Sequence, residues 1–218
     1  MTIKFSKIDD QNRADHHHLT SEDECFYLYE YTSGQGYAFS ETNSLVSNLK
    51  KKPSQKNAPG YHYKGRAIRK AASKMGPAIN PKWLDGAVLV PIPPSKIKGD
   101  PDYDDRIAQI CRSIEADPEV DVRELLYQTE NLRAAHECED RPTVEEIKAV
   151  YAIDETLADP EPKRIAIVDD VITAGAHFRA AKDVLSARFP NAKIVGFFIA
   201  RRIFADPFDT DDLFDVED

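Results

Sequence analysis

Residues 163–185 read KRIAIVDDVITAGAHFRAAKDVL, and the order of residue types within this stretch decides the fold. Residues 165–168 form an unbroken apolar run, which is typical of a β-strand that is covered on both faces. Asp169 and Asp170 follow directly, and the small residues of 173–176 come next, before a helical pattern begins. The stretch therefore predicts a strand, a tight turn and a helix, with an acidic pair where the strand ends.

The segments on either side of this stretch complete a βαβ unit. One side of the expected helix is apolar and carries Phe178, Ala181, Val184 and Leu185. Residues 192–200, AKIVGFFIA, form a second buried strand. Another strand starts after Gly86 and ends at Pro91, because the prolines of PIPP cannot continue a central strand. Strands joined through a helix pair in parallel, so the predicted fold class is α/β with a parallel sheet.

Shorter elements are expected outside this unit. CFYLYEYT alternates, SGQG supplies turn glycines and YAFS resumes the pattern, which together predict a hairpin over residues 25–40. NSLVSNLKK indicates a short helix with Asn43 as its N-cap, and Thr143 with Glu146 has the spacing of a capping box. Two further helices are expected at KGRAIRKAASKM and YDDRIAQICRSIEA, and a strand at VDVRELLYQ.

Length and composition limit the class of protein. At 218 residues the chain can bury a core of its own. We expect four parts: a frayed polar arm at 1–24, a basic N-terminal region at 25–85, a core at 86–203 and an acidic tail at 204–218. Three cysteines without a C-x-x-C pair argue against a disulfide framework or a zinc site. No run approaches the roughly 18 apolar residues that span a bilayer, so a cytoplasmic protein without a membrane partner is expected.

The net charge of −9 is distributed unevenly. Residues 206–218 hold seven acidic side chains and no basic one, whereas residues 42–84 hold ten basic side chains and no acidic one. The cations of 50–74, with the rings of 61–63, could contact the phosphates and bases of a nucleic acid. The same cations could instead form a solvated basic helix or the side of an active site that faces an anionic substrate. The acidic tail could be a disordered end that aids solubility, bind a protein partner, or cover the basic segment as a tethered competitor for polyanions. The histidines at 16–18 lack spaced partners and are a weak metal signal.

The acidic pair and the turn after it point to a ligand. In an open parallel sheet, ligands bind beyond the carboxyl ends of the strands, where the first amides of a helix are unpaired. The amides of 173–177 could hold a phosphate, helped by the positive end of the helix dipole. Asp169 and Asp170 would repel that phosphate unless they faced hydroxyl groups or a cation. The natural ligand is therefore a phosphorylated sugar whose hydroxyl groups donate to the acids.

The acidic pair could also belong to a different kind of loop. A Walker A loop needs G-x-x-x-x-G-K-[ST] and a dinucleotide-binding fold needs G-x-G-x-x-G, and the stretch has neither. A phosphoacceptor receiver domain also has acids after a strand, but too few residues follow Asp170 for the rest of that fold. Asp169 and Asp170 could also simply cap the turn before the helix. The agreement between strand, acidic pair and small-residue turn favours the ligand.

The segment IAIVDDVITAGAHF resembles the phosphoribosyl pyrophosphate loop of type I phosphoribosyltransferases. Together with LVPIPPSK before it and GFFIAR after it, the segment is similar to the ComF family, the competence-associated members of that fold. The likeness covers roughly residues 45–201. It implies a parallel-sheet type I phosphoribosyltransferase fold with an N-terminal hood or hairpin region, and a role in nucleotide metabolism.

The resemblance also implies a role for each part of the site. The catalytic acids that bind the ribose hydroxyl groups are Asp169 and Asp170. The 5′-phosphate is held by Thr173, Ala174, Gly175, Ala176 and His177. The pyrophosphate meets the loop of Pro91, Ile92, Pro93, Pro94, Ser95 and Lys96. Mg²⁺ bridges substrate oxygens without an assigned protein ligand, and a closing loop at 128–143 brings in Arg133, His136 and Arg141, of which Arg141 binds substrate.

The implied reaction transfers the ribose 5-phosphate group of phosphoribosyl pyrophosphate to a nitrogenous base, or back. The enzyme is the first hypothesis, and departures from the family's pattern leave a second one open: a non-catalytic module that senses phosphoribosyl pyrophosphate or a nucleotide, or that assists DNA handling. Ala174 replaces a hydroxyl residue, and His177 replaces Thr or Ser and would donate to phosphate if protonated. Asp104 and Asp105 replace Asn-Gln and add acid beside the expected pyrophosphate. A third hypothesis is a nucleic-acid surface on residues 50–74.

Overall fold

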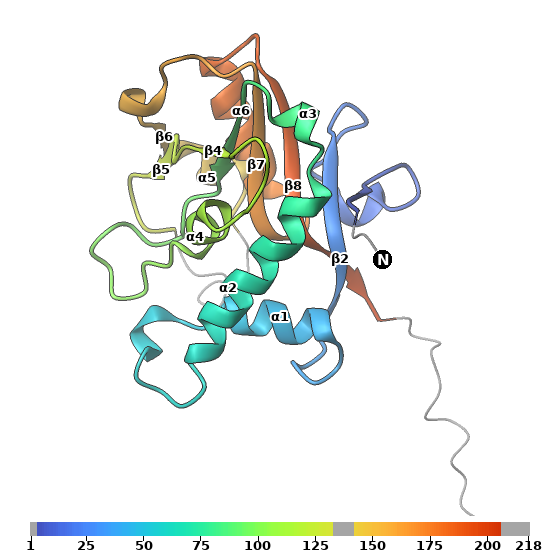
Figure 1. Ribbon diagram of the computed structural model, residues 1–218. Coiled ribbons are helices and arrows are strands. Elements are labelled where there is room, and N and C mark those ends of the chain that lie inside the picture. The colour runs from blue at the N-terminus through green and yellow to red at the C-terminus, as the bar shows by residue number, and fades with distance from the viewer. Residues whose placement is uncertain (1–3, 133–141, 206–218) are drawn as a thin grey trace, which may run out of the picture.

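The central feature of the computed structural model is a six-stranded sheet with helices on both faces (Figure 1). The structure describes residues 4–132 and 142–205. The strand order is β1-β2-β8-β7-β3-β4, in which β1 and β2 pair antiparallel and the other neighbours pair in parallel. The strands are β1 (Ser6–Lys7), β2 (Cys25–Ser33), β3 (Ala87–Pro91), β4 (Asp121–Val122), β7 (Arg164–Ile172) and β8 (Lys193–Phe204). The predicted α/β class with a largely parallel sheet is confirmed.

Helices cover the two faces of this sheet (Figure 1). One face is covered by α1 (Glu41–Leu49), α2 (His62–Met75) and α4 (Arg106–Arg112), and the other by α5 (Val144–Ala149) and α6 (Ala176–Arg188). A small antiparallel sheet of β5 (Leu126–Gln128) and β6 (Tyr151–Ile153) accompanies α5 and α6. The short helix α3 (Pro81–Leu84) precedes β3, and the 3₁₀ helices are η1 (Arg13–His16), η2 (Pro53–Gln55), η3 (Gly76–Ala78) and η4 (Glu155–Leu157). None of the helices in the described part of the chain has the length and apolar character needed to cross a membrane.

Strand β7 contributes to two apolar layers. Ile165 and Ile167 pack in the layer that contains α6, whereas Ala166 and Val168 pack in the layer that contains α2 and α4. Successive side chains of a strand point to opposite faces, so a strand buried on both sides needs an unbroken apolar run. This requirement explains why residues 165–168 show no alternation of apolar and polar side chains.

Strand β2 differs from its prediction, because it is a strand of the central sheet and not one arm of a hairpin. It pairs in parallel with β8, from Cys25 opposite Gly196 to Ser33 opposite Phe204. Residues 37–40 form no second strand. An alternating pattern indicates a strand but does not identify its partner, which tertiary packing decides.

The other local predictions have mixed outcomes. The capping box of Thr143 and Glu146 begins α5 as expected, and β3 ends at Pro91. Asn43 is not the N-cap of α1. The N-cap is Ser40, whose hydroxyl oxygen accepts a hydrogen bond from the backbone N–H of Asn43 at 3.0 Å. The segment VDVRELLYQ is divided between β4 and β5, which belong to different sheets.

The described part of the N-terminal segment is packed, so the expectation of a frayed arm is wrong there. Ile8 and His16 are fully buried. Asp23 is also buried, and it pairs with two cations of α6, Arg179 and Lys182, with Lys182 Nζ 2.6 Å from Asp23 Oδ1. These contacts tie the segment to the helix that follows β7.

Candidate functional site

Asp169 and Asp170 lie inside β7, which continues to Ile172 instead of ending at Val168. The strand continues because β8 pairs with it as far as Ile172. Asp169 shares a face with Ile167, toward α6. Asp170 shares a face with Val168, toward α2 and α4. The two acids therefore face different sides of the sheet at its carboxyl end.

Asp170 is buried between two cations. Its Oδ2 atom accepts a hydrogen bond from Arg106 Nε at 2.9 Å, and Arg106 Nη2 lies 2.8 Å from the same carboxylate oxygen. Lys50 Nζ lies 3.8 Å from Oδ1, which also accepts the Val171 amide at 2.7 Å. Burial alone would raise the pKa of Asp170, but the charges of Lys50 and Arg106 outweigh burial and lower that pKa. Asp170 is therefore an ionised carboxylate that is paired within the protein.

Asp169 has a different environment. Its Oδ1 atom accepts the amide of Asp170 at 2.7 Å, and within the described residues its Oδ2 atom accepts no hydrogen bond. Burial and the neighbouring charge of Asp170 raise the pKa of Asp169 well above its usual range, although Arg106 opposes that rise. A carboxyl group in this state can accept a hydrogen bond from a ligand hydroxyl or hold a proton. Asp169 is thus the member of the pair that is available to a ligand.

A second set of paired charges lies behind Arg106. Lys64 Nζ and Arg106 Nη1 both donate to Asp104 Oδ2, at 2.7 and 2.9 Å. Lys64 also donates to the carbonyl oxygens of Leu49 at 2.6 Å and Lys51 at 2.8 Å. The acid that Asp104 adds near the expected pyrophosphate is therefore neutralised, and the end of α1 is tied to α2 and α4.

The turn at 173–177 has the backbone geometry of an anion site. Gly175 is the N-cap of α6 and has a φ of 91°, in the left-handed region that favours glycine. A Cβ atom at this position would lie 3.2 Å from Leu19 Cδ2, which is a second reason for glycine. Among the hydrogen bonds of 4–132 and 142–205, none has an amide of 174–177 as its donor. These amides, together with the helix dipole, can therefore bind an anion.

The N-terminal segment contacts the carbonyl groups of this turn. The His18 amide donates to the carbonyl oxygen of Ala174 at 3.0 Å, and His16 Nδ1 donates to that of Thr173. In both contacts a carbonyl oxygen of the turn is the acceptor, so the amide donors of the turn are not used. The segment therefore fixes the turn without occupying the amides that a phosphate would need.

His177 lies beside Tyr151 and does not have the environment of an imidazolium. The Tyr151 hydroxyl oxygen and His177 Nδ1 are 2.9 Å apart. Burial lowers the pKa of His177, although the charge of Asp170 opposes the change. Burial and the charge of Asp169 raise the pKa of Tyr151, so the phenol stays protonated. The environment therefore favours neutral imidazole, not the protonated phosphate donor that the sequence suggested.

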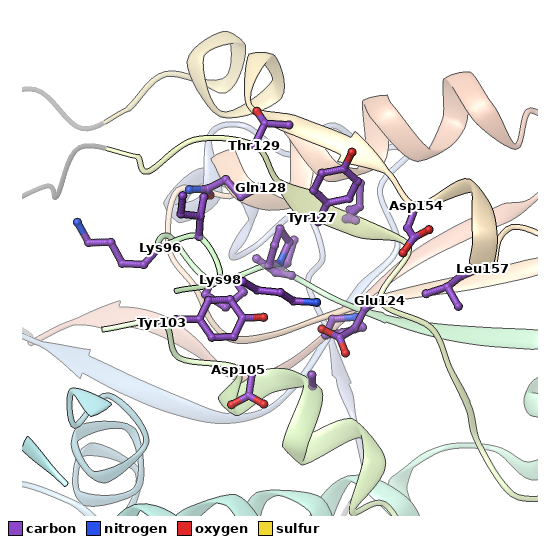
Figure 2. A pocket seen from close by; sticks show the side chains of 17 residues that line it. Lys96, Lys98, Tyr103, Asp105, Glu124, Tyr127, Gln128, Thr129, Asp154 and Leu157 are labelled. Carbon is purple, nitrogen blue, oxygen red and sulfur yellow. The ribbon is translucent and has the colours of Figure 1, made fainter. Parts of the chain in front are cut away.

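The predicted pyrophosphate loop lines a cavity of about 690 Å³ (Figure 2). Its members on the wall are Pro91, Ile92, Pro93, Pro94 and Lys96, while Ser95 instead accepts a hydrogen bond from Gln128 through its carbonyl oxygen. The Ile92 amide donates to the Val168 carbonyl at 2.9 Å, so this wall adjoins β7 at the residue before Asp169. Lys96 and Lys98 line the cavity and form no ion pair with the described residues.

The cavity also contains aromatic, acidic and amide groups. Figure 2 shows Lys96 on one side and the carboxylates of Glu124 and Asp154 on the other. The remaining polar and aromatic lining residues include Tyr103, Asp105, Tyr127 and Thr129. Gln128 Oε1 is buried and has no hydrogen-bond partner within the described residues. A flat heterocycle with N–H donors matches rings and acceptors of this kind.

The residues predicted for the closing loop, Arg141, Arg133 and His136, lie outside the described residues. The flanks of that loop are described. β5 precedes the segment and pairs antiparallel with β6, and Thr143 begins α5 directly after it. Of these flanks, β5 contributes Leu126, Tyr127 and Gln128 to the cavity wall.

One described residue of the site, Asp169, could contact a Mg²⁺ ion. Within residues 4–132 and 142–205, no group of three or more His, Cys, Asp or Glu side chains could hold a metal ion. Asp169 offers one carboxyl oxygen that has no cationic partner, whereas Asp170 is already paired. Mg²⁺ commonly binds one or two carboxylates and takes its other ligands from water and substrate phosphates. Asp169 is the residue that would contact it.

No family model and no curated protein matches this chain.

Several residues of the site received no individual role from the sequence, although Lys50 and Lys64 lie in the basic segment 50–74 and Gln128 begins the expected closing loop. They are Lys50, Lys64, Arg106, Gln128 and Tyr151. Lys50 follows α1 and the other four lie in four different elements, so no local spacing connects one with another. The order Asp-Asp-Arg at 104–106 was the one available hint, because an arginine directly after two acids is placed to neutralise one of them.

Proposed function

We propose that this protein has the type I phosphoribosyltransferase fold, binds phosphoribosyl pyrophosphate with Mg²⁺ and transfers the ribose 5-phosphate group to or from a nitrogenous base. The observation that carries the proposal is the unit of β7, turn and α6. In that unit Asp169 has an uncommitted carboxyl oxygen, and the amides of 174–177 have no partner within the described residues. A ribose 5-phosphate has both a hydroxyl group for the acid and a phosphate for the amides.

Each part of the site has a role in this reaction. The amides of 174–177 hold the 5′-phosphate, and Asp169 accepts a hydrogen bond from a ribose hydroxyl group. The bond from the anomeric carbon to a pyrophosphate oxygen breaks, a bond to a base nitrogen forms, and the proton of that nitrogen passes to pyrophosphate or solvent. The carboxylate of Asp169 stabilises positive charge that develops on the ribose. Mg²⁺, when bound, supplies positive charge that stabilises the departing pyrophosphate.

The cavity beside the loop 91–96 supports a place for the base. Tyr103 and Tyr127 offer ring faces, and Gln128 Oε1 offers an acceptor without a partner among the described residues. The Ile92–Val168 hydrogen bond joins this cavity to the strand that carries Asp169. Donor-bearing heterocycles suit these groups better than bases that carry a carboxylate, because Asp105, Glu124 and Asp154 also line the cavity.

Binding of phosphoribosyl pyrophosphate to the Asp169→Asn variant tests the proposal. Calorimetry with Mg²⁺ should show binding to the wild type and a loss of about tenfold or more in the variant, because a carboxylate accepts a charged hydrogen bond that an amide replaces poorly. The matched control is Asp85→Asn, an exposed aspartate at the amino end of β3. Equal affinity of wild type and Asp169→Asn would contradict the proposal.

A non-catalytic binding module is the second candidate, and one observation favours it. Both oxygens of Asp170 are engaged by Arg106, Lys50 and the Val171 amide, so the second acid of the pair is not open to the ribose. A module of this kind would bind phosphoribosyl pyrophosphate or a nucleotide without turnover. Release of pyrophosphate in the presence of a panel of bases distinguishes the enzyme from the module.

A further inference from the structure

Helix α1 brings a lysine to the acidic pair. Val46 of α1 packs against Val171 of β7 and Ala200 of β8, so the helix lies across the carboxyl ends of these strands. Lys50 directly follows the helix, and its Nζ atom is 3.8 Å from Asp170 Oδ1. Its side chain is 47% exposed, whereas that of Asp170 is 5% exposed. Lys50 therefore connects the buried acid with solvent.

The ammonium donors of Lys50 form no hydrogen bond within the described residues. A separation of 3.8 Å is too long for a hydrogen bond, and no other hydrogen bond of the described residues uses Lys50 Nζ. Lys64, in contrast, donates to three oxygen atoms, and Arg106 donates to two carboxylates. An ammonium group has three donors, so Lys50 is the cation of this cluster that can donate to a ligand.

The cluster has an excess of positive charge at Lys50. The three cations Lys50, Lys64 and Arg106 surround only two paired acids, Asp104 and Asp170. Asp169 forms no ion pair with any of these three cations within the described residues. The nearby Lys52 pairs with an acid outside this cluster. Its side chain is 68% exposed, and its Nζ atom lies 3.9 Å from Asp102 Oδ2. An anion from solvent would balance the charge at Lys50.

We propose that Lys50 is a ligand-binding residue that contacts the diphosphate group of the substrate, and that the contacts of Lys64 with the end of α1 hold it there. The identity of that substrate as phosphoribosyl pyrophosphate rests on the proposed function, whereas the contact itself requires only a diphosphate. The N-terminal region thus supplies a cation to the site in addition to Lys96 of the loop 91–96. Two lysines from separate elements can contact the two phosphates of one diphosphate.

Calorimetry with Lys50→Met tests this assignment, with Mg²⁺ present and three probes: inorganic pyrophosphate, phosphoribosyl pyrophosphate and ribose 5-phosphate. The variant should bind the first two about tenfold or more weakly than the wild type, and ribose 5-phosphate within about threefold. Lys50→Arg keeps the charge and should bind all three probes within about threefold of the wild type. Lys52→Met is the matched control for bulk charge and should change no affinity by more than about twofold.

The outcomes separate this inference from the proposed function. If the wild type binds pyrophosphate in a Lys50-dependent way but not phosphoribosyl pyrophosphate, the inference stands and the proposed function fails. If phosphoribosyl pyrophosphate binds equally to wild type and Lys50→Met, the function stands and the inference is overturned. Equal losses in Lys50→Met and Lys52→Met, or a wild type that binds no diphosphate, also overturn it.

Discussion

Asp169 and Asp170 are adjacent in sequence, but their environments give them different chemistry. Asp170 is held ionised by Lys50 and Arg106, so its function is to fix two cations at the end of the sheet. Asp169 lies on the other face, and its raised pKa leaves it able to exchange a proton or accept a hydroxyl group. Two carboxyl groups whose environments separate their pKa values are a common arrangement in sites that carry out proton or charge chemistry.

His177 gives a test of pH dependence at the scale of one residue. Burial lowers its pKa in the folded protein below the unfolded value of 6.5. The folded chain therefore binds fewer protons at His177 than the unfolded chain, so its contribution to stability is present above about pH 6.5 and is lost as the pH falls. His177→Gln should reduce the decrease in unfolding free energy between pH 7 and pH 5, measured by urea denaturation.

The control for this prediction is His62→Gln, which removes an exposed histidine of α2. Burial also lowers the pKa of His16 and His18, so the wild type keeps part of its pH dependence in every variant. The difference between wild type and His177→Gln is the informative quantity. Parallel pH profiles for these two proteins would show that His177 titrates as it does in the unfolded chain.

At the residue scale, the sequence predicted which side chains mark the site but not how they are paired. The strand, the acidic pair and the glycine turn are adjacent in the chain, so local pattern locates Asp169 and Gly175. Arg106, Lys50 and Tyr151 reach the site from separate elements, and only the folded chain brings them together. The same limit applies to Asp104: the sequence shows its negative charge but not its pairing with Lys64, which comes from another element.

Among the elements, α1, α2 and α4 pack on the sheet through apolar side chains, and one buried lysine joins these helices to one another. Lys64 of α2 donates to the carbonyl oxygens of Leu49 and Lys51 at the end of α1, and to Asp104 before α4. The last carbonyl groups of a helix lack partners within the helix, so a lysine that donates to them stabilises the end of α1. This arrangement sets the position of the residue between them, Lys50.

Lys64→Met tests this role. The substitution should lower the unfolding free energy by about 3–5 kcal/mol, because it leaves Asp104 with one cation and two carbonyl groups without a donor. Urea denaturation with an unchanged m-value measures the loss. Lys70→Met is the control, because Lys70 forms an exposed ion pair with Glu41 that contributes about 0–1 kcal/mol. A loss in Lys64→Met no larger than that of the control would show that Lys64 does not hold these elements together.

Local signals predicted elements well where the partner groups are near in sequence. The capping box of α5 and the apolar face of α6 involve residues within a few positions of one another, and both are confirmed. The hairpin at 25–40 was wrong, because the partner of β2 is β8, far along the chain. The polar N-terminal segment was expected to fray, but Asp23 is buried by cations of α6 that no local pattern indicates.

For the whole molecule, the uneven charge has a partial structural explanation. Within the basic segment, Lys50 and Lys64 pair with acids of the site, and Lys51 donates to the Gly60 carbonyl at 2.7 Å. Arg66 and Arg69 of α2 face solvent instead. Part of the segment thus serves the site, and part remains open to an external anion. The hypothesis of a nucleic-acid surface now depends on the exposed cations of α2.

The acidic tail at 206–218 lies outside the described residues, and its relation to these exposed cations can be tested directly. Seven of its residues are acidic, so a tail tethered to the same chain would compete with polyanions for α2 at high effective concentration. Deletion of 206–218 should tighten binding to single-stranded DNA at low salt by more than the change in net charge predicts, with a steep loss as salt rises. Fluorescence anisotropy measures both effects. A scrambled tail of identical composition is the control, and equal suppression by scrambled and native tails would mean that only bulk charge acts.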